Sequence, residues 1–141
     1  MDLKQYSVDG LMQLRSLLLK TYALIHDPIR HTTGADARNA LGEEVTVQDG
    51  VQWCLLGAQE KAKHDLGLDW IIARHAERLS SRCANELYDL EPVWADPDIN
   101  DDLPLAAAVN DYYGHEAALE ILRCSVQKVR AELKRRQGEG S

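Results

Sequence analysis

The sequence has no phenylalanine, and none of its apolar runs approaches the roughly 18 residues that a membrane-spanning helix needs. Aromatic packing therefore depends on three tryptophans and five tyrosines. Residues 1–9 carry charges from the second position, unlike the apolar core of a secretory signal. Cys54, Cys83 and Cys124 are widely spaced and include no CxxC pair, which is typical of buried, reduced thiols. We therefore expect a cytoplasmic protein that does not enter a membrane.

The short motifs that mark nucleotide-binding sites and hydrolases are also missing. The sequence has no Walker A, GxGxxG or GxSxG motif. His115 and Glu116 begin like the HExxH motif of zinc proteases, but Leu119 stands where the second histidine is required. We therefore expect no cofactor and no metal, and the sequence leaves open whether the protein is an enzyme.

Acidic residues outnumber basic ones by 23 to 16, which gives a net charge of −7. Binding to nucleic acid requires basic surface that displaces counterions, so we expect no direct electrostatic binding of nucleic acid. The negative charge favours a partner with a basic surface instead. With 141 residues, of which 45% are hydrophobic and 28% charged, the chain suits one globular domain. The oligomeric state is not indicated.

Helical periodicity dominates the chain and predicts a mainly α fold. Capping residues, prolines and glycines bound five helical segments, which cover about residues 7–25, 51–66, 70–87, 103–112 and 116–136. The only β-branched run is at 45–47, so we expect a small β-hairpin between the first two helices, pairing 36–38 with 45–47. Together these patterns predict a single-domain bundle of about five helices over residues 1–137, with a disordered tail at 138–141.

Residues 51–63 form the segment around which we expect the other helices to pack. Its apolar residues recur at three- and four-residue spacing, and Trp53 widens the apolar face until the first turns are apolar nearly all round. We expect Asp49 to cap this helix and Gly67 to end it. The small residues Gly57 and Ala58 would let another helix approach closely.

The segment at residues 89–102 is strongly acidic and contains no basic residue. It begins an EF-hand-like pattern at Asp96, but Asp101 occupies the position of the required glycine, so that interpretation fails. A solvated acidic loop that contacts a protein partner is our interpretation, with a weak divalent-cation site as the alternative. The residues expected to make these contacts are Asp96, Asp98, Asp101 and Asp102.

Asn110 and Asp111 form a polar pair between apolar Val109 and two tyrosines, just before an expected helix start. Asparagine and aspartate side chains at such places cap free N–H groups, so capping of the last helix is one interpretation. A ligand-binding site formed with Arg38 and His115 is the other. Residues 30–32 would join this site if the turn at Gly34 packs nearby.

Cys54 allows two interpretations of its own. If the second and last helices cross near it, Cys54, His115 and Asp111 would form a nucleophilic thiol, a base and an orienting carboxylate. Alternatively, Cys54 is a small core residue beside Trp53, with no chemical role.

Three stretches together resemble a family of small, uncharacterised bacterial and phage domains. Residues 33–42 are similar to the family's two glycine turns around an Ala-Arg-Asp sequence, and residues 53–58, WCLLGA, are the most specific match. Residues 109–111, followed by Gly114, are similar to the family's Trp-Asn-Asp turn, although Val109 replaces the aromatic residue. The family has no assigned activity, so the resemblance implies the fold and a bacterial or phage origin only.

We therefore expect a non-enzymatic protein-interaction module of bacterial or phage origin that binds a protein partner through an acidic surface. The alternative is a small hydrolase or small-ligand-binding domain. Its site would lie near Arg38, Cys54, Asn110, Asp111 and His115.

Overall fold

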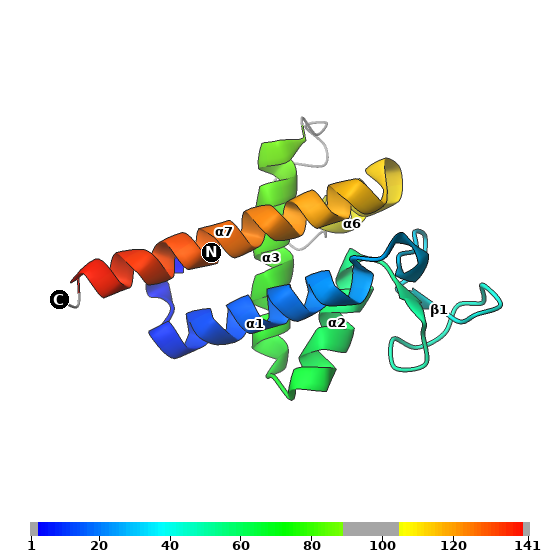
Figure 1. Cartoon of the computed structure of the whole chain (residues 1–141), viewed down its shortest axis with the longest axis horizontal. Helices are drawn as coiled ribbons and strands as arrows, with labels where there is room; N and C mark the ends of the chain where they lie inside the picture. The colour runs from blue at the N-terminus through cyan, green and yellow to red at the C-terminus, as the bar shows by residue number, and fades with distance from the viewer. Residues whose placement is uncertain (1–2, 89–104, 140–141) are drawn as a thin grey trace.

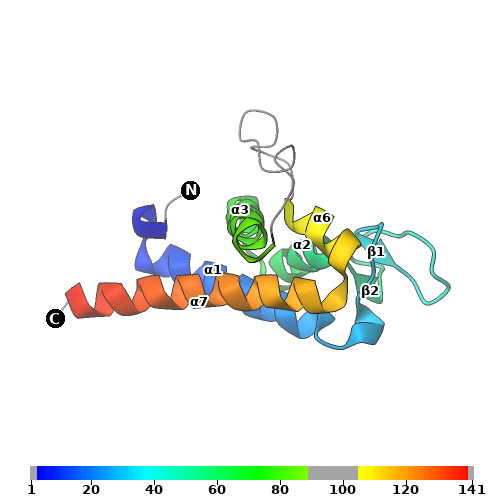
Figure 2. The same ribbon diagram turned by 90° about the horizontal axis from the view of Figure 1, so that it is seen from above.

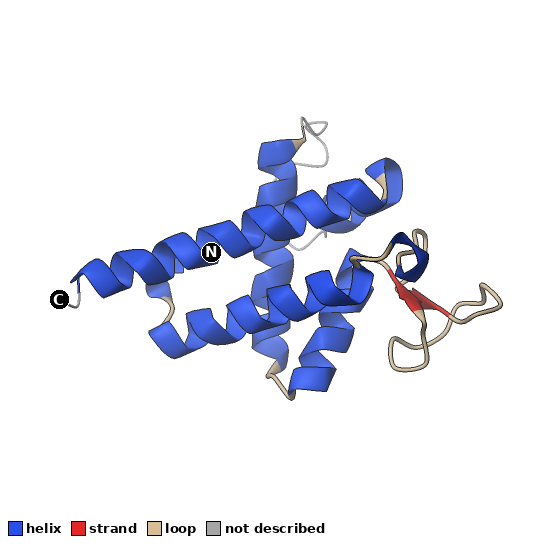
Figure 3. Cartoon of the chain, in the orientation of Figure 1, coloured by secondary structure: helices blue, strands red, loops and turns tan. Residues whose placement is uncertain are grey.

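The computed structural model describes residues 3–88 and 105–139, and this part of the chain is mainly α-helical (Figures 1 and 3). The α-helices are α1 (Val8–Ile25), α2 (Leu55–Leu66), α3 (Trp70–Leu87), α6 (Leu105–Tyr113) and α7 (His115–Glu139). Two single 3-10 turns, η1 (Leu3–Gln5) and η2 (Pro28–Arg30), and two short strands, β1 (Ala37–Arg38) and β2 (Gln52–Trp53), complete it. The predicted mainly α bundle, with a small antiparallel sheet between the first two helices, is confirmed.

Helix α7 lies beside α1, and α3 crosses both of them (Figures 1 and 2). Helix α2 packs against α1, and α6 packs against α3 and α7. The core between these helices consists mainly of aliphatic side chains; its largest fully buried members include Leu11, Leu14, Leu18, Leu55, Leu79, Ile121 and Leu122. Among the helices of the described residues, none has the length and apolar composition needed to cross a bilayer.

Several helix ends follow from local chemistry, as predicted. The Ser7 side chain accepts the Gly10 N–H at 3.0 Å and caps α1, and Asp69 caps α3 by accepting the Ile71 N–H at 3.1 Å. Gly67 ends α2 in the left-handed conformation, with a φ of 65°. Gly114, with a φ of 87°, separates α6 from α7.

The start of α2 differs from the prediction. The helix begins at Leu55 and is capped by Cys54, not by Asp49, because residues 52 and 53 form strand β2. Trp53 pairs with Ala37, and its indole Nε1 donates to the Val47 carbonyl at 2.9 Å. An apolar run of this length cannot distinguish a short strand from the first turn of a helix.

The predicted pairing of residues 36–38 with 45–47 is wrong for the main ladder. Ala37 and Arg38 pair with β2, antiparallel to it. Residues 43–47, after the turn at Gly42, contact β1 through an isolated bridge between Arg38 and Glu44 and the bond from the Val45 N–H to the Ala37 carbonyl.

The last helix is longer than predicted. Helix α7 begins at His115 and continues to Glu139, whereas the sequence predicted an end near residue 136 and a disordered tail from 138. Residues 138 and 139 are therefore helical.

Candidate functional site

Asn110 lies in α6, is fully buried, and connects three segments of the chain. Its Oδ1 accepts the Leu55 N–H at 3.1 Å, at the first turn of α2, and lies 2.6 Å from Nε2 of His31. Its Nδ2 donates to the Thr32 carbonyl at 3.3 Å and to Oδ1 of Asp111 at 3.1 Å. Because a backbone N–H only donates, the bond to Leu55 fixes the amide orientation, and His31 must then donate from a protonated Nε2.

Asp111 holds the turn at Gly34 against α6. Its Oδ1 accepts the Gly34 N–H at 3.0 Å, and Gly34 adopts a φ of 75°. The expectation that the Gly34 turn packs beside Asn110 and Asp111 is confirmed, and His31 and Thr32 join them; none of these bonds involves Arg30. We call His31, Thr32, Gly34, Asn110 and Asp111 the Asn110 cluster.

The side chains of Asn110 and Asp111 thus bind other segments of the chain than the sequence predicted. They lie in the last turn of α6 and do not cap α7. Asn110 instead satisfies a free N–H group at the start of α2, a helix that begins 55 positions earlier. This is a capping interaction supplied from a distant part of the chain.

Arg38 lies on β1 and is occupied by the neighbouring loop. Its Nε donates to Oγ1 of Thr32 at 3.0 Å, and its Nη atoms donate to the carbonyls of Gly42 at 3.0 Å and Thr33 at 3.2 Å. The guanidinium therefore holds together the loop before β1 and the turn after it. Its contact with the Asn110 cluster runs through Thr32.

His115 is the first residue of α7, and its side chain reaches the end of α1. Its Nε2 lies 2.7 Å from the Ile25 carbonyl, which can only accept, so this nitrogen is the donor. The ring centroid is 5.2 Å from that of His31. Burial lowers the pKa of His31, and His115 adds to the fall while the hydrogen bond to Asn110 opposes it.

Cys54 does not have the environment of a nucleophile. Its Sγ accepts the Gly57 N–H at 3.3 Å, and its thiol contacts Oδ1 of Asp36 at 3.7 Å. Burial raises the pKa of the thiol to about 11, so it is protonated at neutral pH, whereas a nucleophilic cysteine needs the thiolate. Within the described residues, no hydrogen bond joins Cys54, His115 and Asp111, because the latter two bind Ile25 and Gly34.

The acidic residues expected to contact a partner, Asp96, Asp98, Asp101 and Asp102, lie outside the described residues.

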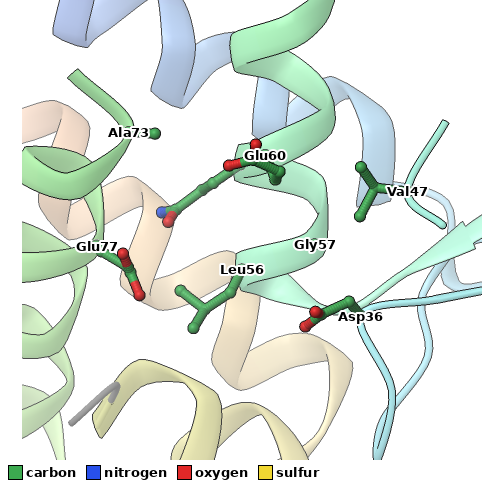
Figure 4. Close-up of a pocket in the computed structure, with 8 residues that line it drawn as sticks. Asp36, Val47, Leu56, Gly57, Glu60, Ala73 and Glu77 are labelled. Carbon is green, nitrogen blue, oxygen red and sulfur yellow. The ribbon is translucent and has the colours of Figure 1, made fainter. Parts of the chain in front are cut away.

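A second group of acidic residues surrounds a cavity of about 310 Å³ between α2, α3 and the segment before β1 (Figure 4). Three carboxylates, from Asp36, Glu60 and Glu77, face this cavity, and none of its lining residues is basic. We call it the acidic cavity; it is lined by Asp36, Val47, Leu56, Gly57, Gln59, Glu60, Ala73 and Glu77.

Glu77 has an environment that disfavours its ionised form. Burial raises the pKa of the Glu77 carboxyl, and Glu60 and Asp36 add to the rise while Arg74 and Arg78 oppose it. Glu60 forms an exposed ion pair with Lys63 one turn along α2, and exposed pairs of this kind contribute little. Burial and the nearby carboxylates therefore disfavour the ionised form of Glu77, and a cation bound in the cavity would stabilise that form.

Gln59 adds an unpaired acceptor to the same cavity lining. Its side chain is 2% exposed, and its Nε2 donates to Oγ of Ser80 at 2.8 Å. Its Oε1 is buried and has no hydrogen-bond partner within the described part of the chain. A buried acceptor left unpaired costs about 1–3 kcal/mol, so a hydrogen-bond donor at this position would be stabilising.

Gly57 positions Asp36 at the cavity. A Cβ atom at residue 57 would lie 2.7 Å from the carbonyl carbon of Asp36 and closer still to its oxygen. That oxygen also accepts the Cys54 N–H at 3.2 Å. The small residue predicted to admit another helix in fact admits the backbone before β1, which brings Asp36 to the start of α2.

The acidic cavity could not be predicted from the sequence, because its carboxylates come from three segments that no local pattern connects. Glu60 and Glu77 each belong to the polar face of a helix, which usually means a solvated surface. Among the residues that the structure describes, no group of three or more His, Cys, Asp or Glu side chains is placed to hold a metal ion. The carboxylates surround the cavity without converging on one point, an arrangement suited to a cation larger than a metal ion.

Comparison with known proteins adds no relative. No family model, curated protein or solved structure matches the chain.

Proposed function

We propose that this chain is a non-enzymatic protein-interaction module that binds a basic side chain of a protein partner in the acidic cavity. The observation that carries the proposal is the lining itself: three carboxylates without a basic residue, next to an unpaired buried amide oxygen. We further propose that the protein is of bacterial or phage origin and works in the cytoplasm. The reduced cysteines and the resemblance described above support that location and origin.

The chemistry of the cavity favours an ammonium or guanidinium group. Both carry several N–H donors and a positive charge, so either group can donate charge-assisted hydrogen bonds to the carboxylates of the cavity. Leu56 and Val47 offer apolar surface to the methylene stem of a lysine or arginine. A volume of about 310 Å³ is at the lower end of ligand sites, which suits one side chain.

The overall charge supports the same class of partner. A net charge of −7 attracts a basic surface at long range and raises its association rate, while the cavity supplies the short-range contact. The Asn110 cluster offers less for a ligand, because the polar atoms of Asn110 are bonded to the protein's own chain. We therefore place the binding site at the acidic cavity.

An NMR titration with N-acetyl-lysine methylamide tests this function. We expect the Gly57 backbone amide and the Gln59 side-chain amide to shift, and the Glu77→Gln variant to bind about tenfold more weakly, because a hydrogen bond to a charged group is worth about 1.5 kcal/mol or more. The matched variant Glu86→Gln removes an acidic side chain from the same helix, where it pairs with Lys128 away from the cavity, and should bind like the parent.

The same probe with its side-chain amine acetylated supplies the chemical control, since it keeps the stem and loses the charge. Shifts at the cavity only with the charged probe would support the proposal. Equal shifts with both probes, or no shift at residues 57 and 59, would show that the cavity does not bind a basic side chain.

A further inference from the structure

Three tyrosines gather where the end of α3 meets the end of α6. The rings of Tyr88 and Tyr113 are stacked, with their centroids 4.7 Å apart and their planes inclined by 30°. The ring of Tyr112 lies 5.7 Å from that of Tyr113, at an angle of 59°. Tyr112 is 78% exposed and Tyr113 is 51% exposed, so the end of α6 presents aromatic surface to the solvent.

Two glutamates, one turn apart at the start of α7, place carboxylates beside these rings. Oε2 of Glu120 accepts the Tyr88 hydroxyl at 2.9 Å. Burial raises the pKa of Tyr88 to about 12, and Glu120 and Glu116 add to the rise. Among the residues that the structure describes, no basic side chain forms an ion pair with Glu120. We call Tyr88, Tyr112, Tyr113 and Glu120 the tyrosine surface.

The protein itself contains an arginine that binds a tyrosine ring and a carboxylate together. The guanidinium carbon of Arg123 lies 5.6 Å from the centroid of the Tyr22 ring. Its Nη1 pairs with Oε1 of Glu116 at 3.2 Å, and its Nη2 donates to the Tyr22 hydroxyl at 3.2 Å. The tyrosine surface offers the same combination of groups to an arginine from another molecule.

We propose that the tyrosine surface binds an arginine side chain of a protein partner. A guanidinium is planar and weakly hydrated, so it stacks on an aromatic ring while its N–H groups donate to a carboxylate. Tyrosine and arginine are both enriched among the residues that dominate protein–protein binding. The tyrosine surface shares no residue with the acidic cavity, so this inference does not depend on the site proposed above.

The charge beside the rings decides between the groups that stack on tyrosine. Nucleic-acid bases stack on aromatic rings, but they bring phosphates that Glu116 and Glu120 would repel. A lysine ammonium is a compact, strongly hydrated charge without a flat face to stack. Arginine is the protein side chain that suits both the rings and the carboxylate.

An NMR titration of the full chain with N-acetyl-arginine methylamide tests this inference. We expect the ring signals of Tyr112 and Tyr113 to shift. The citrulline counterpart of the probe keeps the planar end group and loses the charge, so it should leave these signals nearly unchanged. The backbone amide of Gly57 and the side-chain amide of Gln59 report the acidic cavity separately in the same spectra.

Substitutions separate the ring from the charge. Tyr113→Leu keeps an apolar side chain and removes the ring, so binding followed at Tyr112 should weaken about two- to fivefold, the size of an exposed cation–π contact. Glu120→Gln keeps an acceptor for the Tyr88 hydroxyl and removes the charge, and it should also weaken binding. Trp70→Leu is the control, because it removes a 65% exposed ring at the other end of α3 and should bind like the parent.

Circular dichroism of each variant checks that it is folded. Equal binding of the citrulline probe, or unchanged binding by Tyr113→Leu, would overturn the inference, because a cation on the rings would not be what the surface recognises. Absence of any shift at the tyrosine rings would overturn it too. If the shifts were confined to residues 57 and 59, the tyrosine surface would be excluded while the acidic cavity remained a binding site.

Discussion

Asn110→Ala is expected to lower the free energy of unfolding by about 2–5 kcal/mol, because two donors lose their acceptor and each buried unpaired group costs about 1–3 kcal/mol. The donors are the Leu55 N–H and Nε2–H of His31, which both bond to Oδ1 of Asn110. The loss should also free the start of α2 and the loop before β1 from α6. Chemical denaturation measures the change, with the unfolding slope checked for two-state behaviour.

Asp111→Ala is the matched control for this prediction. Asp111 is exposed, and the Gly34 N–H that it accepts can bond to water once the carboxylate is removed. We expect a loss below about 1 kcal/mol, as is usual for surface substitutions. If Asp111→Ala proved as costly as Asn110→Ala, burial of the Asn110 amide would not be what stabilises this junction.

Gly57→Ala is expected to destabilise the protein by about 1–3 kcal/mol, the usual cost of forcing an extra methyl group into a packed site. The added Cβ would meet the carbonyl group of Asp36, which is backbone and cannot rotate away. The segment before β1 would have to move, and the bond from the Cys54 N–H to the Asp36 carbonyl would be strained. This loss exceeds the roughly 1 kcal/mol that alanine gains over glycine in a helix.

Gly10→Ala is a closely matched control. Gly10 and Gly57 both occupy the third position of a helix, and the N–H of each is accepted by the capping side chain, Ser7 or Cys54. A Cβ at residue 10 would meet only side-chain atoms, the nearest being Oγ of Ser7 at 3.3 Å. We expect Gly10→Ala to be neutral or stabilising. Equal effects at the two positions would mean that the close approach of Asp36 does not restrict residue 57.

The parts of the fold that the sequence predicted depend on residues near one another in the chain. Ser7 and Asp69 cap their helices through N–H groups two or three positions away. Gly67 and Gly114 end or separate helices through their own backbone conformation. Such interactions can be deduced from spacing alone, which is why the helices were predicted with nearly correct bounds.

The parts that were missed depend on distant partners. Strand β2 exists because Trp53 pairs with Ala37 and the Thr32 N–H binds the Trp53 carbonyl, and neither contact follows from the apolar pattern at residues 51–53. The same holds for Cys54, which was interpreted as a position inside a helix and is the capping residue at its start.

The candidate site was predicted in part. Asn110 and Asp111 attracted attention because they are polar residues between apolar ones, and they do bind the turn at Gly34. Their role toward α2 required the fold, since Asn110 and Leu55 are 55 positions apart. The acidic cavity was not predicted at all, because Asp36, Glu60 and Glu77 come together only through the packing of three segments.

The most direct measurement of the central claim is the pKa of the Glu77 carboxyl, followed by NMR without and with saturating N-acetyl-lysine methylamide. In the free protein we expect a pKa above the ordinary value of 4.5, because burial and the nearby carboxylates disfavour the ionised form. A bound ammonium group favours the carboxylate, so the pKa should fall on binding, and by linkage the affinity should rise as the pH rises through the free-state pKa. A Glu77 pKa that stays the same in the presence of the probe would contradict a basic side chain as the occupant of the acidic cavity.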